Sequence, residues 1–168
     1  MKKLTILLLM CFPVFSQEYK VPPEVIKSLI EADPQPIVSF NDDGSLGLVL
    51  NSDGYQSIDD LAKDELRVAG TRLDPVRYTS SRMRYYKSFS LLETKTGEEI
   101  EVDYPENGKF SFFQWSPNED KIAFTNTTNS GVELWIVDVN SRKSSKVIKT
   151  HVNDILNSPF QWFNSNNE

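Results

Sequence analysis

The feature that most constrains the fold is a series of short strand-like segments in the second half of the chain, each ended by a polar turn. Aromatic and β-branched side chains dominate these segments, which occupy residues 110–115, 121–126, 132–139 and 146–149. Four short antiparallel strands within about 40 residues are typical of one blade of a β-propeller. The sequence therefore predicts an all-β architecture built from such blades.

An internal repeat supports this interpretation. The sequence PFQW at residues 159–162 resembles FFQW at residues 112–115, and 47 residues separate Trp115 from Trp162. This spacing lies near the usual blade period of about 40 to 50 residues. A fainter copy surrounds Phe40, 76 residues before the equivalent Ser116. The longer spacing predicts insertions in the first blade, at residues 57–75 and 76–84.

The fold class predicted is an incomplete β-propeller. We divide the chain into a signal peptide (1–16), a Pro-rich arm with a short helix (17–35), a first blade with insertions (36–109), a second blade (110–157) and the start of a third (158–168). Closed propellers have typically about four to eight blades. We therefore expect a piece of a longer product, with assembly from several chains as the alternative.

Local signals predict the shorter elements. Residues 25–30 place apolar side chains on one helical face, and Pro23 suits the first turn. Asp43-Gly44 between two apolar runs predicts a hairpin. Ser57 followed by Asp60 is an acidic variant of a capping box and predicts a helical turn. Further strands are expected at residues 37–40, 46–50, 66–73, 85–92 and 100–102.

The N-terminus has the pattern of an export signal. Lys2 and Lys3 precede an apolar run of about 11 residues, which is shorter than the roughly 20 needed to span a bilayer. Residues 14–16 then offer a signal-peptidase site, with Gln17 as the new N-terminus. A lipoprotein with Cys11 as the lipid-bearing residue is the alternative, and Met10 disfavours it. We expect a periplasmic or extracellular protein without stable membrane insertion after signal cleavage.

Composition excludes several functional classes. The net charge of −6 lacks the basic footprint of a nucleic-acid-binding protein. One Cys and one His exclude a disulfide framework, a zinc finger and a His-rich metal site. We accordingly predict no metal-binding residue, no cofactor and no nucleic-acid partner.

Two sets of residues resemble a known family. The sequence WSPNEDKIAFT at 115–125 resembles the W-S-P-D-G-K-x-I-A-F blade motif of TolB-like and prolyl-oligopeptidase-type propellers, with Glu119-Asp120 in place of Asp-Gly. A more specific ordered series resembles the N-terminal region of exported prolyl-oligopeptidase-type serine peptidases, the glutamyl-endopeptidase-like branch. Its segments are YKVPPEVI at 19–26, YQSIDDLA at 55–62, ELRVAGTRLDP at 65–75 and NTTNSGVELW at 126–135.

The resemblance implies a propeller that filters the access of peptide substrates to a C-terminal α/β-hydrolase domain with a Ser-Asp-His triad. The chain contains no G-x-S-x-G nucleophile motif, so no catalytic residue carries over from the family. We expect this segment alone to be inactive. The alternatives are a non-catalytic periplasmic TolB-like propeller that binds a protein partner, and a small β protein that oligomerises to cover its edges.

Few side chains suggest chemistry of their own. His151 is the only histidine and lies in a polar link, where such a residue is usually a surface side chain. The pairs Asp42-Asp43 and Glu98-Glu99 adjoin glycines, which favours turns over acid–base catalysis. Residues 51–54 faintly resemble a calcium loop that lacks its bidentate Glu.

Two further groups admit a functional and a structural interpretation. Five arginines form the one basic cluster, which either steers acidic peptides or makes local ion pairs; the second interpretation is favoured. They are Arg67, Arg72, Arg77, Arg82 and Arg84. Large aromatic side chains are expected to fill the core between blades. They are Phe110, Phe112, Phe113, Trp115 and Trp135.

Overall fold

The computed structural model describes residues 20–163, and the predicted signal peptide lies outside them. Contacts divide the chain into two units, one ending at Ala32 and one beginning at Asp33. The first unit contains α1 (Glu24–Glu31), which follows Pro23 as predicted. Its apolar side chains are exposed, with Val25 73% accessible. No helix within residues 20–163 has the length and apolar character needed to cross a bilayer.

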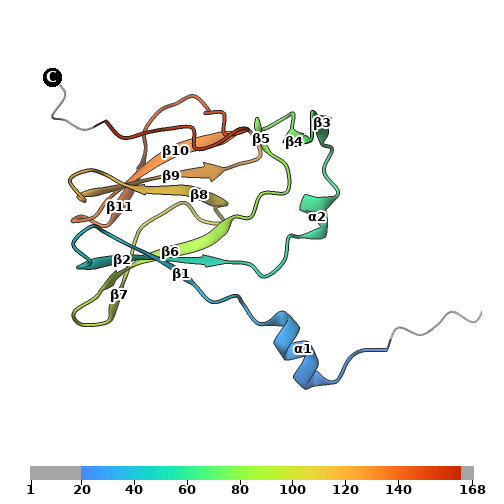
Figure 1. Cartoon of the computed structure of the whole chain (residues 1–168), viewed down its shortest axis with the longest axis horizontal. Coiled ribbons are helices and arrows are strands. Elements are labelled where there is room, and N and C mark those ends of the chain that lie inside the picture. The colour runs from blue at the N-terminus through green and yellow to red at the C-terminus, as the bar shows by residue number, and fades with distance from the viewer. Residues whose placement is uncertain (1–19, 164–168) are drawn as a thin grey trace, which may run out of the picture. The chain divides into compact units, whose positions relative to one another are not determined.

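The second unit is dominated by antiparallel strands, and the all-β prediction is confirmed at that level. Four strands form the first meander: β1 (Ile37–Phe40), β2 (Leu46–Ser52), β6 (Tyr86–Glu93) and β7 (Glu98–Glu101). Four more form the second meander: β8 (Phe110–Trp115), β9 (Lys121–Thr127), β10 (Val132–Asp138) and β11 (Lys143–Lys146). Figure 1 shows the two meanders as two layers.

The two meanders share one core although their backbones scarcely pair. The pair Tyr86–Phe110 joins β6 to β8. Between the layers, Phe89 lies 5.1 Å from Phe124 and 5.4 Å from Phe110, measured between ring centroids. Aliphatic side chains from both meanders complete the buried cluster: Leu48, Leu50, Leu91, Ile122 and Val137. Burial of apolar surface between the layers therefore stabilises their packing, with a few hydrogen bonds beside it, such as that from the N–H of Asp103 to the carbonyl of Arg142 at 2.9 Å.

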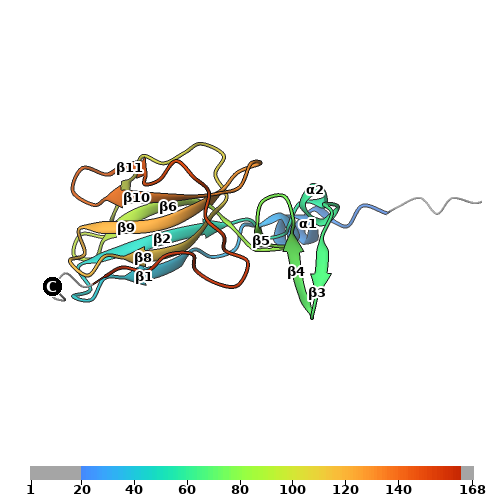
Figure 2. The same ribbon diagram turned by 90° about the horizontal axis from the view of Figure 1, so that it is seen from above.

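The connection from β2 to β6 leaves the large sheet. It contains α2 (Ile58–Leu61) and a small antiparallel sheet of β3 (Leu66–Val68), β4 (Thr71–Asp74) and β5 (Thr79–Ser80). Figure 2 shows this small sheet beside the end of the large one. The predicted single strand at 66–73 is wrong, because Ala69 and Gly70 adopt positive φ (49° and 88°) and turn the chain into a hairpin.

Two other predictions at the end of the chain need correction. The fourth strand of the second meander covers 143–146 instead of 146–149, because Arg142 adopts φ 61° and its N–H reaches the carbonyl of Asp138 at 2.8 Å. This tight turn starts the return strand early. Residues 158–163, predicted to open a third blade, form no strand. Trp162 instead donates to the backbone carbonyl of Gln114 at 3.2 Å, which fastens this segment beside β8.

Candidate functional site

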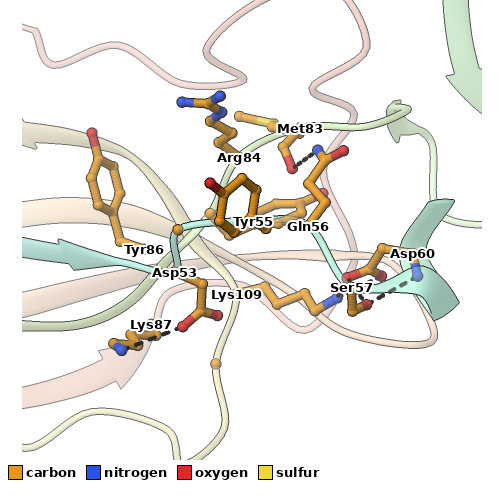
Figure 3. Close-up of a pocket in the computed structure, with 13 residues that line it drawn as sticks. Asp53, Tyr55, Gln56, Ser57, Asp60, Met83, Arg84, Tyr86, Lys87 and Lys109 are labelled. Atoms are coloured by element: carbon orange, nitrogen blue, oxygen red, sulfur yellow. Dashed lines mark hydrogen bonds and ion pairs between the residues drawn. The ribbon is translucent and has the colours of Figure 1, made fainter. Parts of the chain in front are cut away.

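A pocket of about 160 Å³ lies where the long connection leaves β2 and returns to β6 (Figure 3). We call it the junction pocket. Residues 53–57 and 83–87 form most of its wall, and Asp60 of α2, Gly108 and Lys109 complete it. Two sequence segments that are about 30 residues apart thus meet because β2 and β6 are neighbouring antiparallel strands.

One wall of the junction pocket is fixed by the start of α2. The Ser57 hydroxyl accepts from the N–H of Asp60 at 3.1 Å, as the capping prediction required. The Asp60 carboxylate accepts two hydrogen bonds from Lys109, at 2.7 and 2.6 Å. Burial opposes ionisation, but hydrogen bonds from Lys109, Lys63 and Ser57 outweigh it and hold the pKa of Asp60 well below its usual range.

A second ion pair also lines the pocket. Lys87 lies 2.9 Å from a carboxylate oxygen of Asp33 and 3.3 Å from one of Asp53. The hydrogen bond to Asp33 is the main cause of the raised pKa of Lys87. Asp53, the acidic residue of the faint calcium-loop motif, is therefore paired with a lysine.

The segment that carries Arg84 is fastened from across the pocket. The Gln56 side-chain amide donates to the backbone carbonyls of Arg82 and Met83, the latter at 3.1 Å. Arg82 adopts φ 61°, which fixes a turn just before the pocket wall. Figure 3 shows Tyr55, Arg84 and Tyr86 extending to one side of the pocket, away from the ion pairs of Asp53 and Asp60.

Local ion pairs account for most of the arginine cluster. Arg67, Arg72 and Arg82 all contact the carboxylate of Glu65, with N–O distances of 2.9 Å for Arg67 and 3.2 Å for Arg82. Arg77 pairs with Asp74, and its Nε donates at 2.6 Å. The favoured structural interpretation is thus confirmed for four arginines. Arg84 differs, because it has no ion pair among the described residues.

The other residues proposed for chemistry lie apart from the pocket. His151 is exposed, and its Nε2 is 3.4 Å from the Ser130 hydroxyl, with no hydrogen bond to a carboxylate within residues 20–163. The Asp43 carboxylate accepts from the N–H of Ser45 at 2.8 Å, inside its own turn. Glu99 accepts from the hydroxyl of Ser90 on the neighbouring strand. These contacts are structural and assemble no nucleophile, base and orienting acid.

Four of the five aromatic residues predicted for the core are there. Phe110 is fully buried, and Phe113, Trp115 and Trp135 pack against the same cluster. Phe112 is the exception. It adopts φ 54° where the register shifts between Ser111 and Gln114, so that this bulge turns it out of the cluster.

One buried polar group, the carboxyl of Asp154, was not predicted from the sequence. Asp154 is 1% exposed, and neither carboxylate oxygen has a hydrogen-bond partner among the described residues. Burial raises its pKa. Within residues 20–163 the hydroxyls of Thr79 and Thr127 are also buried without a hydrogen-bond partner, and both lie close enough to Tyr85 to influence its pKa. Asp154 follows Asn153 in a polar segment, which gave no signal of burial.

Comparisons with known proteins bear on the resemblance described above. No family model matches the chain. A probable chloroplastic glutamyl endopeptidase of Oryza sativa subsp. japonica is 30% identical in an alignment of 161 positions that covers 88% of this chain and 17% of the relative. Its counterpart from Arabidopsis thaliana is 29% identical in an alignment of 156 positions that covers 86% of this chain and 16% of the relative.

These matches establish a distant similarity that runs along most of the chain. The chain spans less than a fifth of the length of the curated relatives it matches. The predicted resemblance to the glutamyl-endopeptidase-like branch is therefore confirmed as distant homology to proteins of that name.

Proposed function

We propose that this chain is the N-terminal propeller portion of a serine peptidase of the prolyl-oligopeptidase type, glutamyl-endopeptidase-like branch. The observation that carries the proposal is the similarity to two plant glutamyl endopeptidases over 86–88% of the chain. Peptide-bond hydrolysis would belong to a C-terminal α/β-hydrolase domain, and the propeller would control the access of peptides to it.

The packing of the meanders supports the propeller part of this proposal. Neighbouring blades of a propeller are four-stranded antiparallel sheets that stack face to face. The two meanders have four strands each, and a shared aromatic cluster lies between them. We assign them as the first two blades, with the small sheet of β3, β4 and β5 as an insertion in the first.

An exposed apolar face supports the presence of further blades. The register pairs Val38 with Val49 and Phe40 with Gly47, which places these four residues on the face of the first meander opposite Leu48 and Leu50. Phe40 is 53% exposed there. In a closed ring this face would lie against the last blade, so that large apolar side chains would be removed from water.

Catalysis by the chain alone is not part of the proposal. His151 lacks the carboxylate partner that orients a catalytic histidine, within the described part of the chain. The sequence contains no G-x-S-x-G motif. We also propose export to the periplasm or the cell exterior, with cleavage before Gln17; N-terminal sequencing of the native protein tests this.

Immunoprecipitation from the source cells tests the main proposal. Antibodies raised against the recombinant chain should precipitate a polypeptide several times larger than 19.2 kDa. That polypeptide should react with a fluorophosphonate probe and cleave a fluorogenic peptide after Glu. The recombinant chain is the control and should do neither. A precipitated polypeptide of about the recombinant mass, without probe labelling, would refute the proposal.

A further inference from the structure

We propose that the junction pocket binds a carboxylate of an acidic peptide, with Arg84 as the cation that pairs with it. The inference concerns binding by this chain and does not depend on the proposed peptidase function. It rests on the charge balance of the pocket, on the fixed position of Arg84 and on the aromatic side chains around it.

Among the described residues, the charges that line the pocket include one cation without an ion pair. The pocket is lined by three cations, Arg84, Lys87 and Lys109, and by two carboxylates, Asp53 and Asp60. Lys87 is held by Asp53, and Lys109 by Asp60. Their outer partners Asp33 and Lys63 carry opposite charges, so including them leaves the balance at +1. Arg84 supplies that charge within a chain of net charge −6.

Arg84 is presented on a backbone that is already ordered. Gln56 holds the two preceding carbonyls, and Tyr85 and Tyr86 continue directly into β6. A cation on a fixed backbone loses less conformational entropy when it binds than one on a free loop. The guanidinium group presents its N–H donors in a planar fork that matches the two oxygens of a carboxylate.

The surrounding side chains suit the rest of an acidic residue. Tyr55, Tyr85 and Tyr86 line the pocket. Lys109 Nζ lies 5.7 Å from the centroid of the Tyr85 ring, which leaves the rings of Tyr55 and Tyr86 to pack against the methylene groups of a Glu or Asp side chain. The hydroxyls of Tyr55 and Tyr86 provide further donors on the side to which Arg84 extends (Figure 3). A volume of about 160 Å³ admits one side chain rather than a folded partner.

The same balance favours a carboxylate over a phosphate. One bound carboxylate neutralises the excess charge of +1, whereas a phosphate dianion would leave uncompensated negative charge beside Asp53 and Asp60. Inorganic phosphate therefore serves as the competing ligand in the test.

The test is a titration of the isotope-labelled full chain, followed by amide chemical shifts in NMR. The probe is Ac-Ala-Glu-Ala-amide, whose blocked ends leave the Glu side chain as its only carboxylate. It should shift amides at residues 53–57 and 83–87, and added salt should weaken its binding. Ac-Ala-Gln-Ala-amide, matched in shape and uncharged, should bind about tenfold more weakly.

Three variants distinguish binding in the junction pocket from general electrostatic attraction to the chain. Arg84→Gln should weaken binding of the Glu peptide about tenfold. Arg84→Lys should bind with an affinity between those of the parent and Arg84→Gln, because lysine keeps the charge but lacks the planar guanidinium group. Arg67→Gln is the matched control, since Arg67 pairs with Glu65 outside the pocket, and should bind as the parent does. Unchanged melting temperatures show that the variants are folded.

Other outcomes overturn the proposal. Equal binding of the Glu and Gln peptides would exclude recognition of the carboxylate. An Arg84→Gln variant that binds like the parent, or an Arg67→Gln variant that loses as much, would exclude the assignment to Arg84. Tighter binding of inorganic phosphate than of the Glu peptide would exclude a carboxylate as the preferred ligand.

Discussion

The two meanders have the same order of strands and differ in how the second and third strands are connected. In the second meander, β9 and β10 are joined by residues 128–131, where the N–H of Thr128 donates to the carbonyl of Gly131 at 2.9 Å. In the first, residues 53–85 separate β2 from β6. The junction pocket lies at the two ends of this longer connection. The repeated sheet thus provides the framework, and the departure from the repeat provides the site.

The first strands of the two meanders also differ. β1 pairs with β2 and is exposed along its whole length, whereas β8 lies between β6 and β9 and begins with fully buried Phe110. The same position in the repeat is therefore surface in one meander and core in the other. What decides its burial is whether another sheet lies against it, a fact that a single strand sequence does not contain.

The largest effect is expected where the two meanders share their core. Phe124→Ala removes a fully buried ring of the second meander that contacts Phe89 of the first. The resulting cavity should lower the free energy of unfolding by about 3 to 5 kcal/mol. Urea denaturation measures this loss. Phe40→Ala on the exposed face is the matched control and should cost less than about 1 kcal/mol; equal losses would mean that the core is not shared.

A second substitution tests the packing of the segment just before β8, the first strand of the second meander. A Cβ atom on Gly108 would lie 2.0 Å from the ring of Phe110, so Gly108→Ala forces this core ring to move. We expect a loss of about 2 kcal/mol. Gly97→Ala, in a turn of the first meander with φ 72° and open space around it, should cost about 1 kcal/mol through backbone strain alone. A larger loss for Gly97 would contradict the packing at Gly108.

A third test concerns the contact between the long connection and the end of the second meander. The N–H of Asp154 donates to the carbonyl of Tyr78 at 3.2 Å, while the Asp154 carboxyl is buried without a partner among the described residues. Burial raises its folded-state pKa above the unfolded value. The neutral carboxyl is favoured in the folded state. The protein therefore has its full stability below the unfolded pKa of Asp154, and it loses stability as the pH rises through the folded pKa.

Asp154→Asn cannot ionise and should abolish that loss. We expect the variant to be more stable than the parent at pH 7, by about 1 to 2 kcal/mol, with the difference shrinking toward pH 4. Urea midpoints across this pH range measure it. Asp60→Asn is the control with the opposite sign, because the pKa of Asp60 is lowered. The advantage of the parent over Asp60→Asn should stay complete from pH 7 to pH 4 and be lost only as the pH falls further, from the unfolded pKa toward the folded one, so this series extends below pH 4. A parent that is more stable than Asp154→Asn at pH 7 would contradict the burial of this carboxyl without a partner.

Sequence patterns predicted most of the sheet because they reflect local backbone requirements. Residues 121–126 form the expected strand, Asp43-Gly44 forms the expected turn, and Ser57 caps its helix. Where local signals competed, the prediction failed. Residues 66–73 have strand composition throughout, but Ala69-Gly70 turns the backbone in the middle.

The candidate site was less accessible to the same reasoning. The arginine cluster was visible in the sequence, and so was the preference for local ion pairs. That Glu65 pairs with three arginines depends on how β3 and β4 fold back on each other, and Arg84 has no ion pair among the residues that the structure describes. The burial of Asp154 likewise depends on contact with the distant Tyr78. Both are tertiary effects with no local pattern.

The smallest expected effect concerns the departure from the blade motif at Glu119. Glu119 is one of the two residues that replace the Asp-Gly of the motif, and it adopts φ 58° despite having a side chain. Its carboxylate accepts from Asn41 Nδ2 at 2.9 Å and from the N–H of Asp42 at 2.6 Å, so it joins the first turns of the two meanders. Glu119 therefore adds a contact between the two layers that the Asp-Gly of the motif would lack.

Glu119→Ala keeps a non-glycine residue at the strained φ and removes only that contact. We expect a loss of about 0.5 to 1 kcal/mol in the free energy of unfolding, measured by urea denaturation, because two hydrogen bonds to a charged acceptor at a half-exposed site exchange for bonds to water. Glu98→Ala, at the exposed first position of β7, is the control and should change stability by less than about 0.5 kcal/mol. If both variants behave alike, the Glu119 contact contributes nothing to the stability of the packing between the two meanders.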